Sequence, residues 1–533
     1  MNFCFSEYEY SSQRTVVFGR KGMVATTQPL ASQAGLEILK NGGNAIDAAI
    51  ATAACLTVVE PTSNGIGGDA FAIVWTNGNI YGLNSSGPSP KAINIDSVIG
   101  KGYKKIPQHG FIPVTIPGQP YGWKELSRRF GKLPLKEVLE PAIDYARNGF
   151  PVSPIVAYNW QRAANNYKSK LKGEEFKYWF DTFTIDGQAP KAGQIWHNKD
   201  MANTLEELGS TNCMSFYKGD IAEKIHKFSK EHGGYIRKSD LVEYKAEWVK
   251  PLNVNYRGYD IWELPPNTHG IVVLMALNIL KNFDLKKDDS KTYHRMIEAL
   301  KLAYVDGLHY ITDLNKMGID LDELISKDYG IERAKLIKDK AIIPQFGVAN
   351  SGGTVYFATA DSSGNMVSYI QSNFTGFGSG LVVPGTGISL HNRGYTFSLE
   401  PNAHNKLEPQ KKTYHTIIPG FITKNNKPIG PFGVMGAYMQ PQGHLQVMNN
   451  IFDHCLNPQE ALDKPRWQWI EDKTVLVERD FSKDLVEELK RMGHKIKYSN
   501  DIGSFGRGQI ILKDKDILIG GTEKRADGYI GVW

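Results

Sequence analysis

One short stretch, residues 352–365, places a threonine where a backbone bend could expose a peptide bond to chemistry. Gly352 and Gly353 precede Thr354, and a sharp bend at two glycines could open the adjoining carbonyl group to attack. Thr354 to Ala360 contains only β-branched, aromatic or small residues, which predicts a strand. Taken alone, the stretch favours the simpler interpretation, an ordinary strand that begins after a flexible loop.

A second strand is expected directly after the first. Residues 361–365 are rich in turn formers, and Met366 to Ser372 again has strand composition. In a hairpin whose loop is centred on Ser363, paired residues have numbers that add to 726. Thr354 is therefore expected to face Ser372, within one residue if the strand carries a bulge.

The composition excludes several classes of protein. The 533 residues are 41% hydrophobic and 22% charged, as in a soluble globular protein with a large core. The net charge is +6 and the basic residues are scattered, so charge indicates no nucleic-acid partner. Four cysteines without CxxC spacing argue against a disulfide scaffold or a zinc site and favour a reducing compartment: Cys4, Cys55, Cys213 and Cys455.

The N-terminal region and the apolar segments predict a cytoplasmic location. Residues 1–20 are polar and aromatic and lack the apolar core and cleavage site of a signal peptide. The longest apolar stretches are interrupted by Thr, Asn or Gly, so none is expected to span a membrane.

Elements near the N-terminus predict a layered structure. A short strand is expected at 22–27, followed by an amphipathic helix at 29–40 that ends at a glycine pair. A second helix at 45–58 has small or apolar residues around its whole circumference, which indicates burial between layers. The glycine-rich segment 60–71 lacks a GKS/T ending, so it predicts close backbone packing near a site more than a phosphate loop.

The remainder alternates helices and strands. Residues 155–250 predict long, charged and aromatic helices in a peripheral layer, and further helices are expected at 270–283 and 293–306. Residues 335–351 read as a loose polar connection and are the best candidate for a natural break. Such alternation indicates a layered α/β or α+β domain.

Several of these stretches together resemble the γ-glutamyltranspeptidase family of N-terminal nucleophile hydrolases. The blocks occur in the family's order, from about residue 20 to the C-terminus: 23–49, 59–61, 65–68, 298–304, the Thr354 hairpin, 377–380 and 433–443. The resemblance implies an α+β fold, a four-layer αββα sandwich, here with a peripheral helical layer.

The resemblance also implies a precursor that cuts itself between Gly353 and Thr354. The cut would leave segments of 353 and 180 residues, 1–353 and 354–533, which together form one structural unit. The hydroxyl of Thr354 would attack a small amide, and its freed α-amine would take the proton. Water or an amine would resolve the acyl-enzyme. The implied assembly is a cleaved heterodimer that can pair as a heterotetramer, with no metal and no cofactor.

Further roles carry over by position. Ser372 matches a family threonine that hydrogen-bonds the nucleophile. Gly436 and Ala437 match a glycine pair whose backbone N–H groups form the oxyanion hole. An alanine still supplies its N–H group if the backbone conformation is kept.

The positions that select the substrate differ from the transpeptidase pattern. Ser86 replaces an arginine that grips the substrate α-carboxylate, and serine cannot replace a bidentate clamp. A substrate-binding asparagine corresponds to Phe374, so the adjacent Asn373 is expected to bind substrate. Arg393 introduces a cation where the family has an Asn-Gln-x-x-Asp segment, whose carboxylate holds the glutamyl amine. His415 and Thr416 replace a serine pair that positions the substrate carboxylate.

Two interpretations of Arg393 stay open. It could bind a substrate anion with the help of His415, or it could be a structural cation paired with a carboxylate such as Glu408. Glutathione or another γ-glutamyl compound is the default substrate. The alternatives are an amidohydrolase or acylase for another carboxylate-bearing amide, glutaryl- or oxamate-like, and an uncut, non-enzymatic binding protein.

Overall fold

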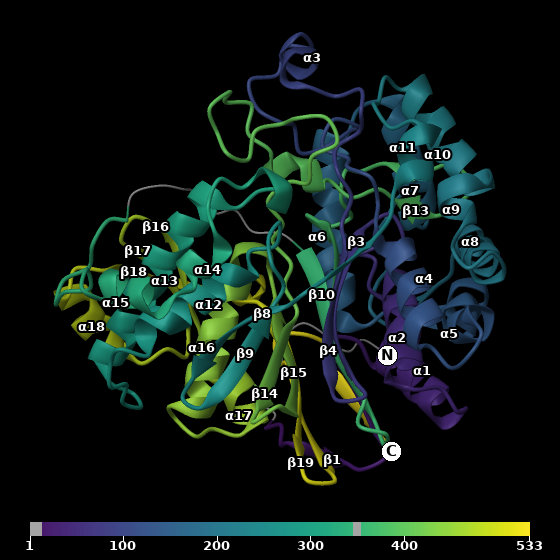
Figure 1. Cartoon of the computed structure of the whole chain (residues 1–533). Helices are drawn as coiled ribbons and strands as arrows, with labels where there is room; N and C mark the ends of the chain where they lie inside the picture. The colour runs from purple at the N-terminus through teal and green to yellow at the C-terminus, as the bar shows by residue number, and fades with distance from the viewer. Residues whose placement is uncertain (1–12, 345–352) are drawn as a thin grey trace.

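The computed structural model describes residues 13–344 and 353–533. Two seven-stranded sheets stack face to face near the centre of the molecule (Figure 1). The first has the order β21 (Tyr529–Val532), β2 (Gly22–Thr26), β10 (Gly353–Asp361), β11 (Met366–Phe374), β3 (Asp69–Thr76), β4 (Asn79–Ser85), β7 (Glu247–Val249). The second has the order β1 (Val17–Gly19), β20 (Ile517–Thr522), β19 (Arg507–Asp514), β15 (Lys427–Met435), β14 (Gly420–Lys424), β9 (Tyr259–Glu263), β8 (Leu252–Tyr256).

Helices cover the outer face of each sheet. On the first sheet lie α1 (Pro29–Lys40), α2 (Ala45–Val59) and α4 (Gln119–Phe130), with α5 (Leu135–Asn148) behind α2. The second sheet's side carries α12 (Gly270–Leu280), α13 (Ser290–Tyr310), α14 (Leu321–Leu324), α15 (Lys327–Ala334), α16 (Gln440–Phe452), α17 (Pro458–Asp463) and α18 (Lys483–Arg491). This arrangement is the αββα sandwich expected from the sequence.

Smaller elements surround the sandwich. The peripheral helices are α3 (Ile95–Ile99), α6 (Pro154–Lys170), α7 (Lys177–Phe183), α8 (Lys199–Ser210), α9 (Ser215–Lys218), α10 (Asp220–Glu231) and α11 (Lys238–Glu243). Short sheets are formed by β5 (Phe150–Pro151) with β6 (Ile195–Trp196), β12 (Val382–Val383) with β13 (Ile388–Ser389), and β16 (Trp467–Glu471), β17 (Thr474–Glu478) and β18 (Lys495–Ser499). The 3₁₀ turns are η1 (Glu174–Phe176), η2 (Leu314–Lys316), η3 (Arg393–Thr396), η4 (Ala437–Met439) and η5 (Ile502–Phe505).

Burial follows the layers. Every residue of α2 is buried, which confirms its expected place between layers. Its start is fixed by a capping box, in which Asn44 and Asp47 satisfy each other's backbone N–H groups. Between the sheets, Tyr356 of β10 packs against Gly433 of β15, where an added Cβ would lie 2.4 Å from the ring. The close approach of the two sheets therefore needs glycine at this position.

The β10–β11 hairpin has the expected register. Val355 pairs with Gln371 and Tyr356 with Ile370, and an irregularity lies between Gly353 and Val355. Thr354 falls within this irregularity, and its Oγ1 lies 3.1 Å from Ser372 Oγ, so the predicted pairing is confirmed within the one residue allowed for a bulge. The predicted connection 335–351 is described only to residue 344, where it has no regular structure after α15, and the remainder lies outside the described residues.

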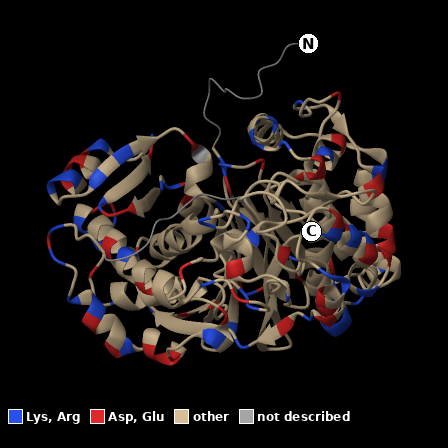
Figure 2. Cartoon of the chain, turned by 90° about the horizontal axis from the view of Figure 1, so that it is seen from above, with Lys and Arg blue, Asp and Glu red and all other residues tan. Residues whose placement is uncertain are grey.

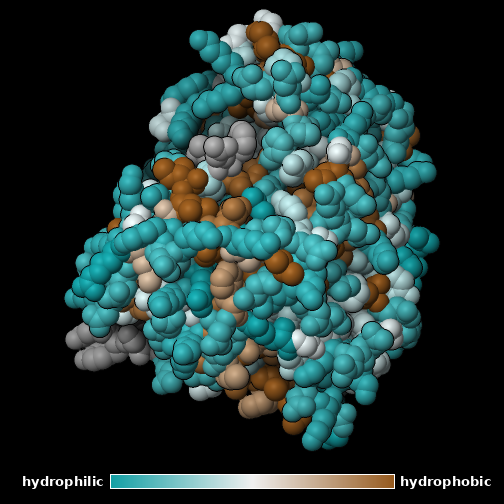
Figure 3. Space-filling view, turned by 60° about the vertical axis from the view of Figure 1, so that its left-hand side comes forward, coloured by the Kyte–Doolittle hydropathy of each residue, from teal (hydrophilic) through white to brown (hydrophobic). Residues whose placement is uncertain are grey.

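The surface is polar and mixed in charge. Basic and acidic residues are interspersed over the peripheral helices (Figure 2). Hydrophobic side chains reach the face seen in Figure 3 in separate patches. None of the described helices is both long and apolar enough to cross a bilayer.

A buried carboxyl group in the glycine-rich segment gives a pH prediction. Burial raises the pKa of Glu60 to about 7, despite Thr27 Oγ1 at 2.5 Å and Arg507 Nη1 at 3.7 Å. Because this pKa exceeds that of the unfolded chain, the associated stability is fully present below about pH 4.5 and is lost as the pH rises through 7. We expect the free energy of unfolding of Glu60→Gln, relative to that of its parent, to rise by about 2–3 kcal/mol between pH 4.5 and pH 8. Urea unfolding measures it, with both proteins carrying Thr354→Ala so that the chain stays uncut. A constant difference across that range would contradict this.

Candidate active site

Thr354 and Ser372 form the centre of the site. Both side chains are buried, and Thr354 Oγ1 lies 3.1 Å from Ser372 Oγ across the hairpin. Gly68 of the glycine-rich segment packs behind this pair, since an added Cβ there would lie 2.7 Å from the Ser372 carbonyl oxygen. The expected close backbone packing is confirmed.

Phe374 ends β11 in an unusual conformation. Its φ is +74°, a left-handed value that is strained for a bulky side chain. The backbone N–H of Phe374 donates to Ser372 Oγ at 2.7 Å. Its ring covers the Arg393 guanidinium, with the central carbon 4.3 Å from the ring centroid. The bend therefore connects the Thr354–Ser372 pair to the arginine.

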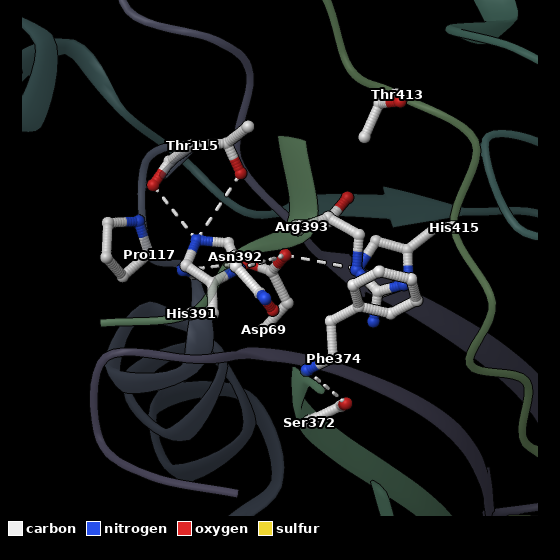
Figure 4. A network of polar contacts seen from close by, with 12 residues as sticks. Asp69, Thr115, Pro117, Ser372, Phe374, His391, Asn392, Arg393, Thr413 and His415 are labelled. Atoms are coloured by element: carbon white, nitrogen blue, oxygen red, sulfur yellow. Dashed lines mark hydrogen bonds and ion pairs between the residues drawn. The ribbon is translucent and has the colours of Figure 1, made fainter. Parts of the chain in front are cut away.

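Asp69, at the start of β3, holds a buried polar network beside this bend (Figure 4). Its Oδ1 accepts the Gly118 N–H at 3.1 Å, and its Oδ2 lies 3.1 Å from His415 Nε2 and 3.4 Å from His391 Nδ1. Burial acts to raise the pKa of Asp69, but His391, His415 and Arg393 outweigh it and the pKa is lowered. The carboxylate is ionised and already has its partners.

His415 is neutral in this network. Burial and the nearby Arg393 lower its pKa to about 3, so at neutral pH it carries one ring proton. Its Nε2–H donates to Asp69, which leaves Nδ1 as an acceptor, and Nδ1 has no hydrogen-bond partner among the described residues. His415 thus presents a buried acceptor beside Arg393.

Arg393 is a fully buried cation, 1% exposed. Its Nη1 donates to Thr416 Oγ1 at 2.7 Å, whereas Nε and Nη2 have no hydrogen-bond partner in the described part of the chain. Burial lowers its pKa to about 9, which leaves it charged at neutral pH. The alternative pairing with Glu408 is wrong, because Glu408 lies near Lys411 and Lys316, at 3.3 and 3.6 Å.

Two further expected or aligned positions, Asn373 and Ser86, have other hydrogen-bond partners. Asn373 is on the opposite face of β11 from Ser372, and its Nδ2 donates to Ser389 Oγ at 2.8 Å beside the glycine-rich segment. The Asn373 side chain therefore points away from the face that carries Ser372, and its role in substrate binding stays a prediction. Ser86 is buried, and its Oγ donates to Asn84 Oδ1 at 2.7 Å.

The turn after β15 carries the two residues expected at the oxyanion hole. Gly436 and Ala437 have φ values of +131° and +49°, and the second is strained for alanine. The Tyr304 hydroxyl donates to the Tyr438 carbonyl, and Gln442 Nε2 donates to the same oxygen at 3.1 Å. These two hydrogen bonds hold the residue after Ala437, so that Ala437 keeps a left-handed conformation that glycine would adopt more easily.

A surface pocket of about 280 Å³ joins these elements. It is lined by Lys105, Ile106, Phe374, Tyr395, Thr396, Phe397 and Tyr438. Phe374 belongs to the bend that covers Arg393, and Tyr438 belongs to the turn of Gly436 and Ala437. The pocket thus has aromatic walls and lies next to the buried guanidinium.

Sequence reasoning missed Asp69 and the role of Phe374. Asp69 follows directly after the glycine pair at the head of a buried strand, and an acid at such a position is a usable signal. In the sequence, Phe374 is visible only as a departure from a family asparagine. A left-handed backbone is common for asparagine, but a phenylalanine in the sequence does not predict one.

The sandwich, with a threonine at the head of a central strand, defines the class of N-terminal nucleophile hydrolases. Residues 31–533 match the family described as gamma-glutamyltranspeptidase. The chain belongs to this family and is an enzyme of it.

Similar proteins cover almost the whole chain. The glutathione hydrolase-like YwrD proenzyme of Bacillus subtilis (strain 168) is 36% identical, over 96% of this chain and 98% of its own. The oxamate amidohydrolase proenzyme of Klebsiella pneumoniae is 32% identical, over 95% and 97%. The crystal structure of cephalosporin acylase from Bacillus halodurans is 54% identical, with a TM-score of 0.98 over 100% of this chain and 99% of that one.

The Thr354–Ser372 contact gives a direct prediction. Ser372→Ala removes one hydrogen bond to Thr354, the predicted nucleophile, and we expect kcat/KM to fall about 10–100-fold. Ser372→Thr restores the hydroxyl and should recover most of the activity. Ser368→Ala is the matched control, because Ser368 is on the same strand as Ser372 and its hydroxyl lies 2.8 Å from the hydroxyl of Tyr356 on β10. Equal losses at both serines would contradict a specific role for Ser372.

Proposed function

We propose that this enzyme is a self-processing threonine amidohydrolase for a small amide that carries a carboxylate. The precursor would cut itself between Gly353 and Thr354. Thr354 Oγ would then attack the amide carbonyl, and the freed α-amine would take the hydroxyl proton and pass it to the leaving amine. Water would hydrolyse the resulting ester, regenerating the hydroxyl and releasing an acid. The N–H groups of Gly436 and Ala437 would stabilise each oxyanion.

The observation that carries this proposal is the unsatisfied guanidinium of Arg393. A buried cation is costly unless it is neutralised and its N–H groups are hydrogen-bonded. Asp69 is near enough to stabilise the charge of Arg393 electrostatically, but it makes no direct contact with the guanidinium group. Among the described residues no carboxylate forms an ion pair with Arg393, while two of its nitrogens lack hydrogen-bond partners. A substrate carboxylate would satisfy both nitrogens in the bidentate manner that guanidinium groups favour. The Phe374 bend links this position to the nucleophile.

The same surroundings favour an acyl group without an α-ammonium. Asp69 is the nearby carboxylate, and it is occupied by His415 and the Gly118 N–H. His415 Nδ1, on a neutral ring beside Arg393, is an acceptor without a hydrogen-bond partner among the described residues, and it suits a substrate N–H more than an ammonium. We therefore favour an oxamate-like or glutaryl-like amide over a γ-glutamyl compound. Relatives named for glutathione, oxamate and cephalosporin indicate that the family accommodates such variation.

The assembly and location follow from the same proposal. The segments 1–353 and 354–533 would stay together as a heterodimer that can pair as a heterotetramer, with water or an amine as acceptor. A cytoplasmic location is supported by free Cys55, Cys213 and Cys455, the cysteines within the described residues.

A substrate panel tests the proposal. Product release would be compared for oxamate, a glutaryl amide, glutathione and γ-glutamyl anilide, each also as an analogue without its carboxylate. We expect kcat/KM to be highest for an amide with a carboxylate and no amine, and to fall at least about tenfold without the carboxylate. A preference for glutathione or γ-glutamyl anilide would instead support a γ-glutamyl compound as the substrate. Equal rates with the uncharged analogues would overturn the role of Arg393.

A further inference from the structure

A second buried polar cluster lies on the opposite side of the second sheet from the nucleophile hairpin. His294 and Glu298 are on α13, and His494 lies between α18 and β18. All three are buried, and one potential ligand atom from each lies within 4.8 Å of the others. His294 Nδ1 is 2.8 Å from His494 Nε2, and His494 Nε2 is 3.9 Å from Glu298 Oε1.

The contacts within this cluster argue against a metal ion. The Lys301 ammonium lies 2.6 Å from Glu298 Oε1 and would repel a cation held by that carboxylate. The two histidines are at direct hydrogen-bond distance, and His294 Nε2 lies 2.6 Å from the Lys338 carbonyl oxygen. The cluster is thus closed by its own hydrogen bonds, and its contacts point toward residues 338–342.

Residues 338–342 are held from two directions. From α13, Glu298 Oε2 accepts the Ile342 N–H at 3.1 Å, Lys301 Nζ donates to the Ile342 carbonyl at 3.1 Å, and His294 contacts the Lys338 carbonyl. From the end of α18, the Met492 carbonyl accepts the Ala341 N–H at 2.7 Å, and the Arg491 carbonyl accepts Lys340 Nζ at 2.8 Å. Most of these bonds are made to main-chain atoms, so they hold the path of the chain.

The two directions belong to different segments of the processed enzyme. A cut after residue 353 leaves α13 and residues 338–342 on the large segment, and residues 491–494 on the small one. We propose that residues 338–342 form a clamp that keeps the end of the large segment attached to the small segment after self-cleavage. This inference rests on the proposed cleavage site. None of its contacts requires the bond between Gly353 and Thr354, so they persist when that bond is cut.

Trypsin can test the clamp directly, because Lys338 and Lys340 have exposed side chains while the main chain around them is held. In the processed enzyme we expect slow cleavage after these lysines. Glu298→Gln and His494→Leu each remove part of the cluster, and each should accelerate cleavage there at least about tenfold, a change of 1.4 kcal/mol in local opening. Lys490→Ala is the control, since Lys490 is on the exposed face of α18 and pairs only with Glu487 among the described residues.

The outcomes separate this inference from the proposed function. Mass spectrometry would score the tryptic cuts, with cleavage after the exposed Lys335 as internal reference. A single uncut wild-type chain would contradict the proposed processing. Two fragments, with equal tryptic rates in wild type and both variants, would overturn only the clamp. One equivalent of zinc that copurifies and is lost in His494→Leu would also overturn it, in favour of a metal site. A thermal melt of each variant confirms that it is folded.

Discussion

Thr354→Ala is expected to leave a single chain of 59.5 kDa that neither cuts itself nor hydrolyses amides. The substitution removes the hydroxyl that attacks in both reactions, and activity should fall at least about 1,000-fold. Thr354 Oγ1 contacts Ser372 Oγ at 3.1 Å, so the loss removes one group from a small buried site and leaves the fold intact. Denaturing electrophoresis after long incubation, with N-terminal sequencing of each band, measures the result.

The control for this variant is Thr354→Ser, which keeps a hydroxyl. It should give two fragments, the smaller beginning at residue 354, and should retain measurable activity. If wild type and Thr354→Ala both remain single chains, the enzyme is not processed at this bond. If both are cut, the nucleophile for self-cleavage is another residue.

Arg393→Met should raise KM for carboxylate-bearing amides roughly 30–1,000-fold. Losing one partner of a buried, hydrogen-bonded charge pair costs about 2–4 kcal/mol, and 1.4 kcal/mol corresponds to a factor of ten. Methionine fills much of the same volume against Phe374, so the packing of the bend is preserved. kcat should change far less than KM, because Arg393 contacts no reacting atom in the proposed mechanism.

Two comparisons make the Arg393 result specific. Arg393→Lys keeps the charge but not the planar fork, and we expect it to recover only part of the affinity. For analogues without a carboxylate, wild type and Arg393→Met should have similar KM values. An unchanged KM for the carboxylate substrates in Arg393→Met would return Arg393 to a structural role.

The sequence carried the hairpin and its partner residue because both depend on local rules. A strand alternates its faces with period two, and the turn formers after Ala360 fix the loop. These two facts place Thr354 opposite Ser372 without knowledge of the rest of the chain. The uniform burial of α2 likewise followed from its composition. The family resemblance then supplied the layers, and it predicts the cleavage site.

Only the tertiary structure decided how the residues proposed to select the substrate are arranged. Asp69 lies more than 300 residues from His391, Arg393 and His415, and they meet because β3 pairs with β11 while the segments after β13 cross its end. Whether Arg393 has a counter-ion depends on burial and distance, which composition does not specify. Asn373 shows the same limit, since one step along β11 places its side chain on the other face of the sheet. The sequence by itself thus determined the family and the pairing of Thr354 with Ser372, and the packing of distant segments determined what surrounds the proposed nucleophile.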